Sequence, residues 1–151
     1  MTPEDPELEQ KAVLTDLFTE IAILEHLMRN RLKPRYEGLY SIAEFGLLNY
    51  FGRMKRDEDR LSHIAYSFEV SEAEARVPVD SLVARGLFTI DGAPDPCVRM
   101  TAAGSTAHAD LIKSLAPDVL EIVDGLDPEL LRVTAETLKE IRRTVDNLPG
   151  R

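Results

Sequence analysis

The chain has 151 residues, of which 44% are apolar, so its length and composition predict one compact domain or a small domain with extended helical arms. It carries 27 acidic and 18 basic residues, a net charge of −9, and residues 1–40, 41–100 and 101–151 each contribute −3. This even acidity reveals no basic lobe, and it disfavours anionic membranes and acidic substrates as partners.

The cysteine content and the N-terminus favour a cytoplasmic location. A single cysteine, Cys97, excludes an intrachain disulfide and fits a reducing environment. The N-terminus is acidic and polar, unlike a secretory signal, and no apolar run is long enough to span a bilayer. We therefore expect a cytoplasmic protein with no membrane partner.

The first predicted element is a long helix from about Glu7 to Lys33, which Pro34 is expected to end. Its apolar residues recur three and four positions apart, which is the period of one helix face. Other apolar residues widen this stripe beyond what packing on a single core requires, which predicts a second subunit. The stripe contains Val13, Leu17, Ile21, Leu24, Met28 and Leu32, and it is widened by Leu14, Phe18, Ile23 and Leu27.

The middle of the chain has the pattern of a helix-turn-helix. Ser41 is placed to cap a helix that runs to about Met54, and a charged turn at 53–60 precedes a short apolar helix from Leu61. These two helices would support the one that follows.

Ser71 starts that next helix, with Glu74 three residues on, the spacing of a capping box. Pro78 lies in the second turn, where it removes one backbone hydrogen bond and should bend or restart the helix. Gly86 is expected to end the helix, because glycine adopts the left-handed conformation of a helix end without strain.

A β-hairpin and two helices complete the prediction. Residues 87–90 and 98–100 are β-prone and are separated by turn formers at 91–97. Thr101 caps a helix to about Asp124, with a kink expected at Pro117. Asp127 followed by proline starts the last helix, which stops at Pro149-Gly150.

The order and spacing of these elements resemble the MarR family of bacterial transcriptional regulators over nearly the whole chain. The resemblance implies a mainly α fold with a small β-hairpin: a winged helix-turn-helix with N- and C-terminal dimerisation helices. It divides the chain into an N-terminal dimerisation helix (1–40), a winged lobe (41–104) and C-terminal dimerisation helices (105–151). The likeness rests on the long first helix, the Leu61–Ala65 helix, Val70-Ser71, Asp80–Leu87, Met100–Gly104 and Leu126–Glu129.

For function, the resemblance implies a homodimer that binds double-stranded operator DNA and responds to a small-molecule effector held between the dimer helices and each lobe. The DNA-binding positions would be Ser71, Glu72, Glu74, Arg76, Val77, Arg85 and Arg99. The effector pocket would be bordered by Tyr36, Tyr40, Phe45 and Tyr66, and the alternative interpretation of these aromatic residues is packing in the core.

The sequence departs from the family pattern where DNA would be touched. Glu72 and Glu74 replace an arginine and a threonine, Val77 replaces a basic residue, and the hairpin is shorter, without the family's aspartate-and-arginine wing motif. Carboxylates close to phosphate repel it. The alternative hypothesis is therefore a winged-helix protein-interaction module that has lost DNA binding.

Motifs for catalysis or cofactor binding are absent from the sequence. It contains no phosphate loop, nucleophile elbow or dinucleotide fingerprint, so we predict neither an enzyme nor a cofactor. His26, His63 and His108 lie on three different predicted helices without ligand spacing, so no metal site is predicted. Cys97 is interpreted as a passive thiol rather than a redox sensor.

Overall fold

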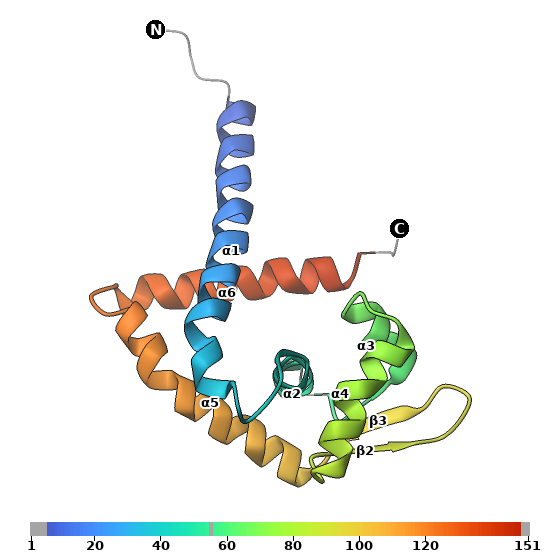
Figure 1. Cartoon of the computed structure of the whole chain (residues 1–151). Coiled ribbons are helices and arrows are strands. Elements are labelled where there is room, and N and C mark those ends of the chain that lie inside the picture. The colour runs from blue at the N-terminus through green and yellow to red at the C-terminus, as the bar shows by residue number, and fades with distance from the viewer. Residues whose placement is uncertain (1–5, 55, 149–151) are drawn as a thin grey trace, which may run out of the picture. The chain divides into compact units, whose positions relative to one another are not determined.

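The computed structural model describes residues 6–54 and 56–148 and is mainly helical with one small antiparallel sheet (Figure 1). This confirms the predicted fold class. The chain forms two compact units, which divide within the fifth helix, between Leu115 and Ala116. The elements are α1 (Pro6–Tyr36), α2 (Ile42–Met54), β1 (Glu58–Arg60), α3 (Leu61–Ser67), α4 (Glu72–Ala84), β2 (Phe88–Asp91), β3 (Cys97–Met100), α5 (Ala102–Ile122) and α6 (Pro128–Asp146).

Helix α1 does not end at Pro34, as the sequence analysis expected, but continues to Tyr36. Proline removes one backbone hydrogen bond of the last turn. The loss is offset by packing, because Tyr36 is buried and its ring stacks on Phe45 with centroids 4.3 Å apart. The amide of Glu37 also donates to the carbonyl of Lys33 at 2.9 Å, which extends the helical pattern past the proline.

Ser41 caps α2, as predicted, and it does so as half of a capping box. The backbone amide of Glu44 donates to Ser41 Oγ at 3.1 Å, and the Ser41 amide donates to Glu44 Oε2 at 2.6 Å. Two otherwise unpaired amides at the helix start are thereby satisfied.

The sheet has three strands in the order β1-β3-β2, one more than the predicted hairpin. The prediction of a turn throughout 53–60 is wrong, because residues 58–60 form β1 and pair antiparallel with β3. Glu58 lies opposite Arg99 in this register, and an ion pair between opposite charges favours the pairing. Strands β2 and β3 pair as predicted, with their bounds shifted by one residue.

The core of the first unit lies among α2, α3, α4, the sheet and α5. Phe51 and Phe88 pack edge to face at its centre, with ring centroids 5.0 Å apart. Helix α4 runs through Pro78 without a break, so the predicted restart does not occur. Ala75 and Val79, on either side of that proline, are buried in the core and hold the helix in place. Other fully buried side chains are Leu48, Ile64, Leu82 and Val98.

Helix starts near the C-terminus follow the sequence signals. The Gly104 amide donates to Thr101 Oγ1 at 3.0 Å at the start of α5. In the second unit, Asp127 accepts from the amide of Glu129 at 2.9 Å, and Pro128 is the first residue of α6. Helix α6 ends at Asp146, and the predicted stop at Pro149-Gly150 lies outside the described residues.

Gly104 is a position where only glycine fits, so Gly104→Ala tests the close approach of α5 to the backbone of Leu87, directly before β2. An added Cβ would lie 2.2 Å from the carbonyl oxygen of Leu87, a backbone atom that cannot rotate away. We expect the free energy of unfolding, measured by urea denaturation, to fall by about 1–3 kcal/mol or more. The exposed neighbour Ser105 supplies the control, since Ser105→Ala should change it by less than about 0.5 kcal/mol. Equal stability of the two variants would contradict this packing.

Candidate nucleic-acid interface

The N-terminus of α4 is closed by the predicted capping box. The Glu74 amide donates to Ser71 Oγ at 3.2 Å, and the Ser71 amide donates to Glu74 Oε2 at 2.9 Å. The Ser71 hydroxyl also donates to Glu74 Oε2, at 2.7 Å. These hydrogen bonds lower the pKa of the Glu74 carboxyl. The structure thus engages both residues in the start of the helix, with a negative charge at that end.

The exposed face of α4 carries Ala73, Arg76, Val77 and Asp80, which recur at helical spacing. Arg76 Nε lies 2.7 Å from Asp80 Oδ1, an exposed ion pair one turn apart. Val77 is 69% exposed and presents an apolar side chain where a DNA reader commonly has a polar one. Glu72 is exposed on the first turn.

Arg85, which follows α4, contacts the loop between α1 and α2. Its Nη1 donates to the carbonyl of Leu39 at 2.9 Å, and its guanidinium lies 4.3 Å from the centroid of the Tyr40 ring. The same Nη1 is 3.9 Å from Glu44 Oε1. Arg85 therefore anchors the end of α4 to this loop.

Glu44 fixes α4 to α2 from inside the lobe. Only 8% of this residue is exposed, and Oε1 accepts from the hydroxyl of Ser81 on α4 at 2.6 Å. Burial raises the pKa of the Glu44 carboxyl, but hydrogen bonds from Ser81 and Ser41, together with the charge of Arg85, outweigh burial. The net pKa lies below its ordinary value, so the ionised carboxylate is the form that joins the two helices.

Arg99 lies on β3 between two carboxylates. Its Nε is 2.7 Å from Glu58 of β1, and its Nη1 is 2.7 Å from Asp91 of β2. The hydrogen bond to Glu58 and the charge of Asp91 raise the pKa of the guanidinium. The charge of Arg99 is thus balanced within the sheet.

The short hairpin turn folds against the start of α3, and this contact was not predicted. Asp95 accepts from the amide of Ser62 at 3.1 Å and from its hydroxyl at 2.7 Å, which caps α3 from a distant part of the chain. Arg60 Nη1 donates to the Asp95 carbonyl at 2.8 Å. No local sequence signal identifies such a cap, because the partners are 33 residues apart.

A second polar cluster, also missed by the sequence analysis, surrounds Asp59. Its Oδ2 accepts from the hydroxyl of Tyr50 at 2.7 Å and from Arg56 Nη1 at 2.9 Å, and His63 Nδ1 lies 2.8 Å away. Burial raises the pKa of Asp59. The hydrogen bonds from Tyr50, His63 and the Arg60 amide lower it by more than burial raises it, so the net pKa is below the ordinary value. The cluster joins α2, β1 and α3.

The four predicted pocket residues are only partly brought together. Tyr36 and Phe45 stack on each other, Tyr36 within the core, and Tyr40 lies under the Arg85 guanidinium. Tyr66 is 73% exposed on α3 and contacts none of these rings among the interactions described. The effector pocket therefore stays a prediction.

The structure also bears on the thiol of Cys97, on metal binding and on membrane-spanning helices. Burial raises the pKa of the Cys97 thiol, which disfavours the reactive thiolate. Across residues 6–54 and 56–148, no three metal-ligating side chains converge on one point. None of the helices in these ranges combines the length and the apolar character needed to cross a bilayer.

Comparison of the structure with solved structures identifies the fold. MarR of E. coli in its apo form superposes with a TM-score of 0.66 at 17% identity, over 83% of this chain and 95% of that one. The chain adopts the MarR winged-helix fold. A MarR family protein from Bacillus stearothermophilus matches over 92% of this chain and 97% of its own, with a TM-score of 0.67 and 14% identity. MepR, a transcription regulator of the Staphylococcus aureus multidrug efflux pump MepA, has a TM-score of 0.60 at 13% identity, over 83% of this chain and 95% of that one.

Comparisons of the sequence alone add no relative. A scan against protein-family profiles finds no match, and neither does a search of curated protein sequences. At such low identity the similarity establishes the MarR fold and no more.

Replacement of Glu44 tests the link between α2 and α4. We expect Glu44→Gln to lower the free energy of unfolding at neutral pH, because the amide loses the ionic part of the contacts with Ser81, Ser41 and Arg85. The folded pKa of Glu44 is below the unfolded value of about 4.3, so the stabilisation is complete above that pH and is lost as pH falls through the lower value.

The measurement is urea denaturation of both proteins from pH 7 to pH 3. The difference in the free energy of unfolding should be largest at pH 7 and should shrink below about pH 4. Glu37→Gln, which changes an exposed glutamate 3.5 Å from Lys33, serves as the control and should alter stability little. A difference that stays constant with pH would mean that ionisation of Glu44 does not hold the helices together.

Proposed function

We propose that the protein is a homodimeric transcriptional regulator, cytoplasmic and without catalytic activity, that presents α4 to operator DNA. The observation that carries the proposal is the placement of α4, which packs against α2, α3 and β2 and leaves Ala73, Arg76, Val77 and Asp80 in solvent. In helix-turn-helix proteins the second helix of the motif enters the major groove. The solved structures of the same fold are of transcriptional regulators, which supports this role.

Arg76 is the side chain on this face best placed to contact phosphate. Its partner Asp80 is 52% exposed, and exposed ion pairs contribute only about 0–1 kcal/mol. A phosphate can therefore replace Asp80 at low cost. Arg99 is held by two carboxylates and Arg85 by Glu44 and Tyr40, so each would have to give up more contacts to reach DNA.

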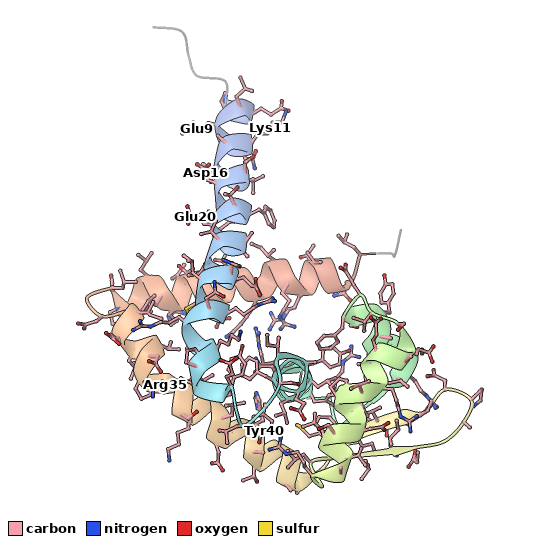
Figure 2. The ribbon with its side chains drawn as sticks, viewed as in Figure 1. Glu9, Lys11, Asp16, Glu20, Arg35 and Tyr40 are labelled. Carbon is pink, nitrogen blue, oxygen red and sulfur yellow. The ribbon has the colours of Figure 1, made fainter. Side chains whose placement is uncertain are left out.

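The homodimer is proposed from apolar side chains left exposed within each unit. On α1, Glu9, Asp16 and Glu20 lie along one side (Figure 2), and helical spacing places Leu14 and Phe18 on the opposite side. Contiguous exposed apolar surface of this kind marks an interaction site. The proposed dimerisation segments are residues 1–40 and 105–151, which flank the lobe at 41–104. Exposed apolar residues include Leu24 and Leu27 of α1 and Leu130, Val133 and Val145 of α6.

A second candidate function is a winged-helix interaction module that no longer binds DNA. The observation that favours it is the pairing of all three predicted arginine contacts, Arg76, Arg85 and Arg99, with carboxylates of the same chain. A lobe whose positive charges are internally neutralised has little field to attract phosphate. A small-molecule effector would modulate either function.

Arg76→Ala tests contact of α4 with DNA. We expect it to weaken binding of a labelled promoter fragment from around the protein's own gene by about three- to tenfold at low salt, with the salt dependence reduced by about one released ion. Glu72→Arg should strengthen binding, since it replaces repulsion of phosphate by attraction. The measurement is fluorescence polarisation across a salt series.

The matched control for this experiment is Arg132→Ala, which removes a similarly exposed, ion-paired arginine from α6. It should leave DNA affinity unchanged. Absence of binding by the unaltered protein at low salt would favour the interaction module, whereas binding that ignores both α4 variants would place the DNA contact elsewhere.

The apolar side of α1 can be tested without changing the net charge. Leu14→Ser combined with Phe18→Ser should convert a dimer at micromolar concentration into a monomer, because two exposed apolar anchors of the interface are removed. Sedimentation velocity gives the mass. The control is Asp16→Ser with Glu20→Ser on the opposite side, which should remain dimeric. A monomeric unaltered protein would contradict the proposal.

A further inference from the structure

A small apolar pocket opens between α2, α3 and α4 of the lobe. Its walls are the side chains of Leu47, Ile64, Phe68, Val70 and Pro78, and its volume is about 110 Å³. Exposed apolar surface continues from it, since Phe68 is 37% and Val70 is 40% exposed. The helix-turn-helix therefore has a hydrophobic recess where its two helices meet.

The walls of this pocket are rigid. Phe68 packs edge to face with Tyr50, with centroids 5.6 Å apart. The ring also touches α2 one turn earlier, so closely that a Cβ on Gly46 would lie 3.1 Å from Phe68 Cε1. Ile64 and Leu47 belong to the buried core. The recess is thus formed before anything binds, which spares a ligand the cost of ordering it.

The size of the pocket decides what it can accept. Sites for whole small molecules usually measure about 300–1,000 Å³, and a cavity of about 150 Å³ holds one benzene. A recess of 110 Å³ therefore fits a single aliphatic side chain of a larger partner rather than an effector molecule.

The charge beside the pocket is negative. Glu74 contributes to the lining, Glu69 lies between the lining residues Phe68 and Val70 along the chain, and Glu72 is two residues before Glu74. Glu69 and Glu72 are exposed and form no ion pair with another residue of the described ranges, unlike most of the arginines of the lobe. An aliphatic side chain flanked by basic residues would complement both the apolar recess and the negative charge beside it.

We propose that this pocket docks a basic segment of another protein by taking one aliphatic side chain into the recess, while Lys or Arg residues beside it meet Glu69, Glu72 and Glu74. Binding would combine burial of one apolar side chain, about 1.5–3 kcal/mol, with several exposed ion pairs. The segment would therefore bind weakly unless further contacts add to it.

Docking at this pocket is independent of DNA contact by α4. The pocket residues Glu74, Ala75 and Pro78 lie on a different face of α4 from Arg76, Val77 and Asp80, as their helical spacing requires. Ala43→Leu changes the pocket and Arg76→Ala changes the proposed DNA face, so failure of one activity does not imply failure of the other, whereas the E69Q/E72Q variant shares Glu72 with the DNA test.

The test uses the short peptide N-acetyl-Lys-Leu-Lys amide as a probe, followed by chemical shifts of the backbone amides in two-dimensional NMR of the full-length protein. We expect saturable shifts at Val70 and Ala75 with a dissociation constant in the millimolar range. Peptides with alanine at the centre or glutamate at both flanks should bind at least about tenfold more weakly.

Two variants locate the site. Ala43 is exposed but lines the pocket, so Ala43→Leu should fill the recess and reduce affinity at least about tenfold without disturbing the core. The matched control Ala73→Leu, on the exposed face of α4, should bind as the unaltered protein does. The double variant E69Q/E72Q should lose about two- to fivefold. Undetectable binding of the lysine peptide, equal binding of the glutamate peptide, or binding that survives Ala43→Leu would overturn the proposal.

Discussion

The contact between Glu44 and Ser81 determines where α4 is held. One carboxylate completes the capping box of α2 and accepts a hydrogen bond from Ser81 of α4, and Arg85 at the end of α4 approaches the same group. A buried carboxylate is unstable unless hydrogen bonds replace its lost water. Because these partners come from α4 and from Ser41 before α2, a shift of α4 would leave the charge unsatisfied. Arg85 also couples the end of α4 to the loop after α1 through the carbonyl of Leu39.

Other arginines of the lobe are also paired with carboxylates of the same chain. Arg56 pairs with Asp59, Arg76 with Asp80, and Arg99 with Glu58 and Asp91. Each of these three arginines is paired with a carboxylate, which stabilises the fold locally and weakens the positive field that they would otherwise produce. Of these three arginines, Arg76 is the one held by a single exposed carboxylate, so its pair is the most easily exchanged for a phosphate.

Sequence signals correctly predicted the structural features that depend on residues close together along the chain, such as helix starts and helix ends. The capping box of Ser71 and Glu74 and the end of α4 before Gly86, whose φ of 72° suits glycine, both follow from residues a few positions apart. The continuation of α1 past Pro34 could not be predicted, since it depends on packing of Tyr36 against Phe45 of the next helix.

For the candidate interface, the sequence located α4 and its acidic start but not the partners of its arginines. Arg99 and Glu58 are 41 residues apart, and β1 exists only because β3 pairs with it. The contact of Asp95 with Ser62 likewise depends on the folded position of the hairpin turn. Contacts between residues this far apart in the chain produce no periodic pattern in the sequence from which they could be predicted.

The tether between Asp95 and Ser62 has a consequence for the size of any operator. If α4 enters a major groove as proposed, a hairpin whose turn is held to α3 by Asp95 would not extend into the neighbouring minor groove. A lobe built in this way would read the major groove alone and would be insensitive to the width of the neighbouring minor groove. Its half-site would then be compact, and A·T-rich flanks would confer no advantage.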